Sequence, residues 1–110
     1  MATNLKNLSD YDPGTVPDAS DMSFAIVVSE WNPEVTKALL EGAVKTLQKH
    51  GTREGSIDIQ WVPGSFEIPL ASQLMAETGM YHAILCLGCV IQGETRHFDF
   101  ICQGVTQGIT

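Results

Sequence analysis

One polar stretch late in the chain places a glycine turn beside a histidine. An apolar run over residues 83–90 leads into Gly93-Glu94-Thr95-Arg96, and His97 follows, ahead of an alternating Phe98-Asp99-Phe100. The run is typical of a strand buried on both faces of a parallel sheet. A buried strand, a glycine turn and a helix start together present free backbone N–H groups to an anion. We therefore expect His97 to lie at the mouth of a crevice, next to a potential phosphate-binding site.

The same residues allow other interpretations. A glycine turn after a strand is usually only a turn, and a lone histidine near a helix start is more often a surface or capping residue than a catalyst. Gly88 and Gly93 have the spacing of P-loop glycines, but Glu94-Thr95 stands where Lys-Ser/Thr is required, which excludes an ATP site of that type. The stretch Glu94-Arg96-His97-Asp99 offers metal-ligand types, but no second cluster supports a metal site, so the sequence predicts neither a metal nor a cofactor.

Length and composition indicate one acidic globular domain. The 110 residues are 44% hydrophobic and 17% charged, which argues against a disordered chain. Six basic against thirteen acidic residues give a net charge of −7. This balance disfavours nucleic acid and anionic membranes as partners, and an anionic substrate must be held by local donors.

Cysteine usage and the polar start predict a cytoplasmic protein. Cys86, Cys89 and Cys102 lie in apolar surroundings, which favours packed, reduced thiols. Cys86 and Cys89 match CxxC, but no second pair supports zinc or redox chemistry. The start MATNLKNLSDYD is not a secretory signal, and no run approaches the ~18 apolar residues of a membrane span.

The chain divides into an arm and a domain. Residues 1–22 contain two prolines and four aspartates, which predicts an extended N-terminal arm that can dock on a neighbouring subunit. Residues 23–110 alternate strands and helices. Strands are predicted at 24–30, 57–62 and 81–91, the second nearer the sheet edge, and helices at 33–50, 66–79 and 99–108. This order predicts an α/β fold, a three-layer α/β/α sandwich with a parallel sheet.

Local signals predict the helix ends and inward faces. Asn32 and Ser65 are suited to cap helix N-termini, and Gly51 to supply a left-handed C-terminal cap. The spacing of apolar residues predicts the inward positions of each helix. They are Val35, Leu39, Ala43 and Leu47 in the helix at 33–50; Ala71, Leu74, Met75 and Thr78 in the helix at 66–79; and Phe100, Ile101 and Val105 in the helix at 99–108.

Three polar turns follow the strands, at Trp31, at residues 65–67 and at residues 93–97. Because the carboxyl ends of parallel strands meet at one edge of a sheet, these turns are expected to converge on a single site. Trp31 is either a plug over a helix start or an aromatic lid on a planar ligand. Glu67 is either a charge that stabilises a helix dipole, by ~0.3–1 kcal/mol, or a ligand contact.

Three motifs in order resemble one family. Trp31-Asn32, VPGSFEIP over residues 62–69 and GCVIQGETRHFDF over residues 88–100 are similar to 6,7-dimethyl-8-ribityllumazine synthase, the penultimate enzyme of riboflavin biosynthesis. The resemblance covers about residues 22–110. It implies a flavodoxin-like sheet and a transferase that condenses 5-amino-6-(D-ribitylamino)uracil with 3,4-dihydroxy-2-butanone 4-phosphate, releasing phosphate and water.

The resemblance also assigns substrate contacts and roles by position. It implies that Trp31 stacks on the pyrimidine, that Cys89, Val90 and Ile91 contact the pyrimidine through their main chain, and that Ser65, Phe66 and Glu67 contact the ribityl chain. It also implies that Glu94 and Thr95 bind the phosphate of the butanone and that His97 transfers protons.

Assembly is implied in the same way. The family forms pentamers, some of them built into icosahedral shells of sixty subunits, with active sites between adjacent subunits. Its chains continue past the position of Thr110 with a further strand, helices, a phosphate-binding arginine and an aromatic residue for a neighbour's site. The resemblance therefore implies a domain that is incomplete at its C-terminus.

Two other function classes compete with the enzyme. A binding module would hold a flavin or lumazine without catalysis, and a structural shell subunit would need no ligand. Trp31, Glu67 and His97 together favour the enzyme. A flavodoxin-like response domain is the least favoured class, because no aspartate ends a strand where a phosphoacceptor would sit.

Overall fold

The computed structural model describes residue 7 and residues 9–110, so the first part of the predicted arm lies outside the described residues. Strands and helices alternate as predicted. The elements are η1 (Pro13–Thr15), β1 (Phe24–Ser29), α1 (Pro33–Lys49), η2 (Glu54–Ser56), β2 (Ile57–Val62), η3 (Ser65–Glu67), α2 (Ile68–Glu77), β3 (Ala83–Leu87) and α3 (His97–Ile109).

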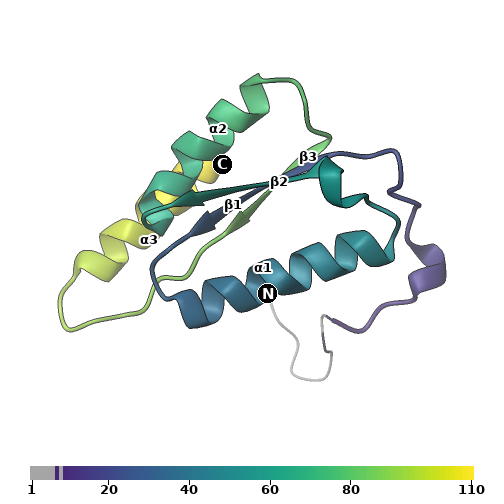
Figure 1. Ribbon diagram of the computed structural model, residues 1–110. Coiled ribbons are helices and arrows are strands. Elements are labelled where there is room, and N and C mark those ends of the chain that lie inside the picture. Colours follow the sequence, from purple (N-terminus) through teal and green to yellow (C-terminus); the bar gives the residue numbers. More distant parts are fainter. Residues whose placement is uncertain (1–6, 8) are drawn as a thin grey trace.

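A three-stranded parallel sheet lies between two helical layers. The strand order is β2-β1-β3, and β1 pairs in parallel with both neighbours. α1 covers one face, and α2 and α3 cover the other (Figure 1). All six residues of β1 are buried, and Val27 packs with Val62 of β2 and Ile68 of α2. The predicted three-layer α/β/α sandwich is confirmed, as is the edge position of β2.

The most apolar predicted strand is not the central one. β3 ends at Leu87 instead of running to Ile91, and both Ala83 and Cys86 are exposed, so the expectation of a strand buried on both faces was wrong. β3 pairs with β1 along one side only, whereas β1 lies between two strands and two helical layers. Burial follows this position in the sheet more closely than local hydropathy.

The inward face of α1 differs from the predicted stripe. Val35 and Leu39 are 41% and 42% exposed, whereas Thr36 is fully buried and Leu40 is half-buried. A step of four residues advances by about 40° more than one helical turn, so a stripe drawn at every fourth residue does not stay on one face. The first two members of the stripe are exposed, whereas Ala43 and Leu47 are half-buried. Gly51 has φ +104°, which confirms the predicted left-handed cap.

The later helices expose part of their predicted inward stripes. Ala71 and Met75 of α2 pack against the core, but Leu74 is exposed on the same outer face as Leu70. Thr78 is also exposed. α3 packs against α2 and η3 with Ile101 and Val105 half-buried, and its Phe100 is 63% exposed. α3 begins at His97, two residues earlier than predicted.

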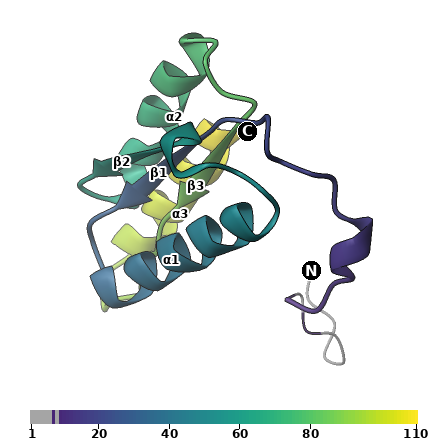
Figure 2. The same ribbon diagram turned by 45° about the vertical axis from the view of Figure 1, so that its right-hand side comes forward.

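The described part of the arm contacts the C-terminal end of α1. The Ala19 N–H donates to the His50 carbonyl at 2.8 Å, and Thr52 Oγ1 donates to the Ala19 carbonyl at 3.3 Å. Tyr11 Oη lies 2.9 Å from His50 Nε2. Figure 2 shows this segment running outside the three layers. Docking of the arm on a neighbouring subunit stays a prediction.

At the amino end of the sheet, the Tyr81 hydroxyl donates a hydrogen bond to Asp58 of β2. This bond to the carboxylate, with smaller effects of burial and charge, raises the pKa of Tyr81 above the usual 10.0. The folded chain then holds this proton more tightly than the unfolded chain. The stabilisation is therefore fully present below about pH 10 and is lost as the pH rises through the raised pKa.

We expect the free energy of unfolding to fall as the pH rises above about 10, and to fall less in Tyr81→Phe. Urea unfolding across this range measures it. Tyr11→Phe leaves one tyrosine, so its ultraviolet absorbance titration reports the pKa of Tyr81 directly. A Tyr81 that ionises like free tyrosine would contradict the expected coupling to Asp58.

Candidate active site

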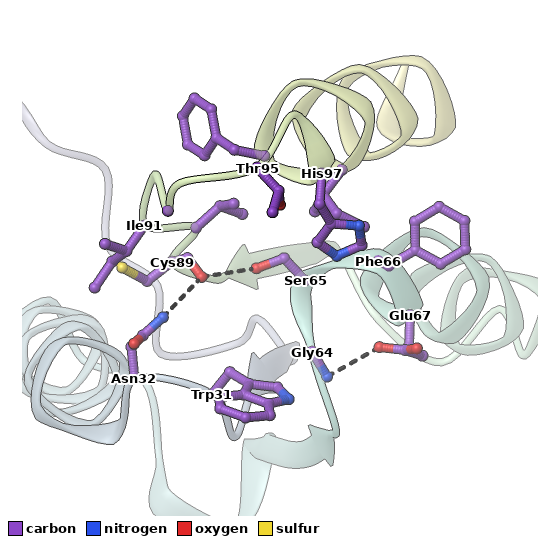
Figure 3. A pocket seen from close by; sticks show the side chains of 14 residues that line it. Trp31, Asn32, Gly64, Ser65, Phe66, Glu67, Cys89, Ile91, Thr95 and His97 are labelled. Atoms are coloured by element: carbon purple, nitrogen blue, oxygen red, sulfur yellow. Dashed lines mark hydrogen bonds between the residues drawn. The ribbon is translucent and has the colours of Figure 1, made fainter.

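A cavity of about 540 Å³ lies at the carboxyl ends of the three strands (Figure 3). Its size is within the range of small-molecule sites. The walls come from the β1–α1 turn, the β2–α2 connection with η3, and the segment from β3 into α3. The lining residues are Trp31, Asn32, Gly64, Ser65, Phe66, Glu67, Cys89, Val90, Ile91, Gly93, Thr95, His97, Phe98 and Ile101. The expected convergence of three polar turns is what the structure shows.

The structure brings all of the sequence-predicted site residues into this lining except Glu94. Glu94 is exposed and outside the lining, so Thr95 alone of the proposed phosphate pair faces the cavity. Among the lining residues that sequence reasoning did not assign to substrate are Asn32, Phe98 and Ile101. The helical spacing from His97 to Ile101, one turn along α3, was the available signal.

The turn after β1 holds a strained asparagine. Asn32 has φ 59° and ψ 59°, the left-handed region, and is the one non-glycine residue with positive φ among those the structure describes. The predicted helix cap is wrong in its side chain: Asn32 occupies the N-cap position, but its side chain makes no capping hydrogen bond. Instead, Asn32 Nδ2 donates to the carbonyl of Cys89 at 3.4 Å.

Ser65 also serves a distant partner. Gly64, not Ser65, is the N-cap of η3, so this cap prediction was wrong. Ser65 is buried, and its Oγ donates to the same Cys89 carbonyl at 3.3 Å. Figure 3 shows both hydrogen bonds meeting at this one oxygen.

Glu67 is tied to the turn that precedes it. Its Oε2 accepts the Gly64 N–H at 2.9 Å, and its own N–H donates to the Gly64 carbonyl at 3.2 Å. An ionised carboxylate has about four acceptor positions, so one hydrogen bond leaves the others open to a ligand. The capping and ligand interpretations of Glu67 are therefore compatible.

The cavity mouth presents large apolar side chains. Trp31 is 71% exposed, and Phe66 and Ile91, which line other parts of the cavity, are also exposed. The Trp31 N–H donates to the Pro63 carbonyl at 3.2 Å, which fixes the backbone but leaves the indole uncovered. An indole this exposed does not plug the start of α1, and its face is available for a planar molecule.

His97 is the first residue of α3, and Thr95 lies just before it. The first N–H groups of a helix have no intrahelical partners, so this end suits an anion. The described lining contains no Lys or Arg. Any phosphate seated there would be held by backbone donors, the Thr95 hydroxyl and His97.

Comparison with known proteins identifies the family. Residues 21–110 match the family described as 6,7-dimethyl-8-ribityllumazine synthase. Curated proteins of that name include one from Parabacteroides distasonis, 54% identical over 110 residues, and one from Porphyromonas gingivalis, 50% identical over 110 residues. Each alignment covers the whole chain and 69% or 68% of the relative. The chain belongs to the 6,7-dimethyl-8-ribityllumazine synthase family.

A third family member, from Phocaeicola vulgatus, is 53% identical over 109 residues, which are 99% of this chain and 65% of the relative. The chain thus spans about two thirds of the length of these lumazine synthases. The family assignment, the enzyme class and the link to riboflavin biosynthesis that the three motifs implied are confirmed.

The structure also bears on metals, thiols and membranes. Within the described ranges, no group of three or more His, Cys, Asp or Glu side chains is placed to hold a metal ion. Cys86, Cys89 and Cys102 are free thiols. No described helix combines the length and apolar character needed to cross a membrane.

Proposed function

We propose that this cavity condenses 5-amino-6-(D-ribitylamino)uracil with 3,4-dihydroxy-2-butanone 4-phosphate to give 6,7-dimethyl-8-ribityllumazine, phosphate and water. One observation carries the proposal. One cavity is lined by the open indole face of Trp31, the carboxylate of Glu67 and the imidazole of His97 at a helix start. Each of these residues follows a different strand. These are the groups that a planar ring, a polyhydroxyl chain and a phosphate ester require.

The ring end of the cavity is formed by Trp31 and the segment after β3. The pyrimidine stacks on the indole, and main-chain groups of residues 89–91 read its edge. The ribityl chain extends along η3, where Ser65, Phe66 and Glu67 contact it. The open acceptor positions of Glu67 suit the hydroxyl groups of that chain.

The phosphate end is formed by the start of α3. Backbone N–H groups and Thr95 hold the butanone phosphate, and the exposed Glu94 points its charge away from it. His97 transfers protons as the amine attacks the ketone and as phosphate leaves, because imidazole exchanges protons near neutral pH. The aminouracil supplies its own nucleophile, so much of the rate comes from holding the two substrates together.

The protein is proposed to act in the cytoplasm as a homo-oligomer, a pentamer or a sixty-subunit shell. Four large apolar side chains, Leu70, Leu74, Phe100 and Ile109, are exposed on α2 and α3 of the single chain. Exposed apolar groups gathered on two neighbouring helices are typical of subunit interfaces. Three free thiols fit a reducing compartment.

Replacing Trp31 by alanine should weaken ring binding without unfolding the chain. Because the indole is 71% exposed, little core burial is lost, and the midpoint of thermal unfolding should stay within a few degrees. Loss of stacking should raise the KM for the aminouracil by about tenfold. Trp31→Phe is the matched control and should restore most of the affinity. A KM that is unchanged in Trp31→Ala would contradict stacking.

The direct test mixes the purified chain with both substrates, follows the lumazine product by absorbance and measures the mass of the chain in solution. Product from a pentamer or larger assembly supports the proposal. A folded chain that binds the aminouracil but forms no product favours a binding module instead. A chain that assembles and binds neither substrate favours a structural subunit.

A further inference from the structure

The Cys89 carbonyl is the point where the three walls of the cavity are tied together. It accepts Asn32 Nδ2 from the β1–α1 turn at 3.4 Å and Ser65 Oγ from η3 at 3.3 Å. A carbonyl oxygen has two lone pairs, and these two donors occupy them. A ligand would therefore have to share this oxygen with two protein donors.

Two local features accompany these hydrogen bonds: a left-handed backbone at Asn32 and a glycine at position 88. Asn32 takes a left-handed conformation without forming a cap, and its carbonyl accepts the N–H groups of Val35 and Thr36. Asparagine tolerates this region better than most residues, and backbone strain of this kind is concentrated at functional sites. On the other side, a Cβ on Gly88 would lie 2.6 Å from Ser65 Oγ, so only glycine allows that hydroxyl to approach.

We propose that Asn32 and Ser65 are positioning residues that act through the Cys89 carbonyl. By holding this oxygen they fix the backbone of Val90 and Ile91, whose own N–H and C=O groups then read the edge of the pyrimidine. The inference rests on the proposed function and refines it. Ser65 donates its hydroxyl proton to the protein backbone, so it can contact the ribityl chain only as an acceptor, and the Cys89 carbonyl is already engaged by two protein donors.

The phosphate end should be insensitive to this arrangement. His97 is the first residue of α3 and Thr95 lies two residues before it, whereas the Asn32 and Ser65 hydrogen bonds end at Cys89. Loss of either donor should therefore weaken recognition of the aminouracil and leave recognition of the butanone phosphate unchanged. A merely structural role would affect both substrates alike.

Asn32→Gly is the sharpest test, because glycine readily adopts the left-handed backbone conformation while the side chain that carries the amide donor is removed. We expect the KM for the aminouracil to rise about tenfold, the KM for the butanone phosphate to stay within about twofold, and kcat to change little. Ser65→Ala should give the same split. Calorimetric titration of each variant with the aminouracil alone should show the same tenfold loss in Kd.

Thr36→Val is the matched control. It removes the buried Thr36 hydroxyl, which donates to the Asn32 carbonyl at 3.5 Å, but it leaves the Asn32 amide in place. This variant should lose stability without changing the KM for either substrate. If Asn32→Gly behaves like Thr36→Val, or raises both KM values equally, the positioning role is overturned while the proposed function stands. An unaltered chain that binds no aminouracil overturns both.

Discussion

Replacing His97 by alanine is expected to lower kcat by about a hundredfold when both substrates are saturating. His97 lies at the first position of α3 and lines the cavity with Thr95. In the proposed reaction, protons must move there as the imine forms and as phosphate leaves. The reaction should not stop, because the site still holds the amine and the ketone together and that proximity supplies a large part of the rate. The initial rate of lumazine formation measures the effect.

His82→Ala is a matched control for this variant. His82 precedes β3, so it lies at the opposite end of the parallel strands from the cavity, where its Nδ1 accepts the Ser23 N–H at 3.0 Å. Its removal should cost some stability and leave kcat of the folded protein within about twofold. A His97→Ala protein that turns over at the unaltered rate would remove His97 from the proton transfers.

The architecture and the place of the site could be predicted because their signals are local. Continuous or alternating apolar runs mark where strands form, although not how deeply each is buried, and the glycine at residue 51 marks the end of α1, where the structure gives it a left-handed conformation. Each polar turn follows a strand, and parallel strands all end at the same edge of the sheet, so the parallel topology alone predicts that the turns lie together. The cavity lined by Trp31, Glu67 and His97 is the result.

What could not be predicted depends on partners far along the chain. Asn32 and Ser65 have strong local preferences for helix caps, yet their hydrogen bonds go to Cys89, which is 57 and 24 residues away. The spacing of apolar residues likewise predicts the apolar face of a helix, but it does not show which residues of that face are buried against another element of the chain. Leu74 and Phe100 are exposed for that reason.

The glycines of α3 show the same limit. In the sequence, Gly104 and Gly108 indicate a weak helix. In the structure they permit close packing: a Cβ on Gly104 would lie 2.9 Å from the Phe66 ring, and one on Gly108 would lie 2.7 Å from Pro69. The low helix propensity is therefore offset by contact between α3 and the segment that carries η3 and α2.

Gly88→Ala should be the most destabilising of the small changes near the site. A Cβ there would lie 2.6 Å from Ser65 Oγ and 2.8 Å from Ile68 Cδ1, and Ile68 is a buried member of the core. Overpacking of this kind lowers the free energy of unfolding by about 2 kcal/mol. Because the displaced hydroxyl is one of the two donors to Cys89, the KM for the aminouracil should rise as well.

Gly42→Ala separates overpacking from the general effect of adding a methyl group. Gly42 lies inside α1, and a Cβ there meets nothing within 4 Å, so alanine should raise the free energy of unfolding by about 1 kcal/mol through better helix propensity. Urea unfolding of the two variants side by side should thus give changes of opposite sign. Equal changes in both would show that the segment after β3 relaxes freely, and a backbone that relaxes freely could not hold the Cys89 carbonyl in place for the pyrimidine.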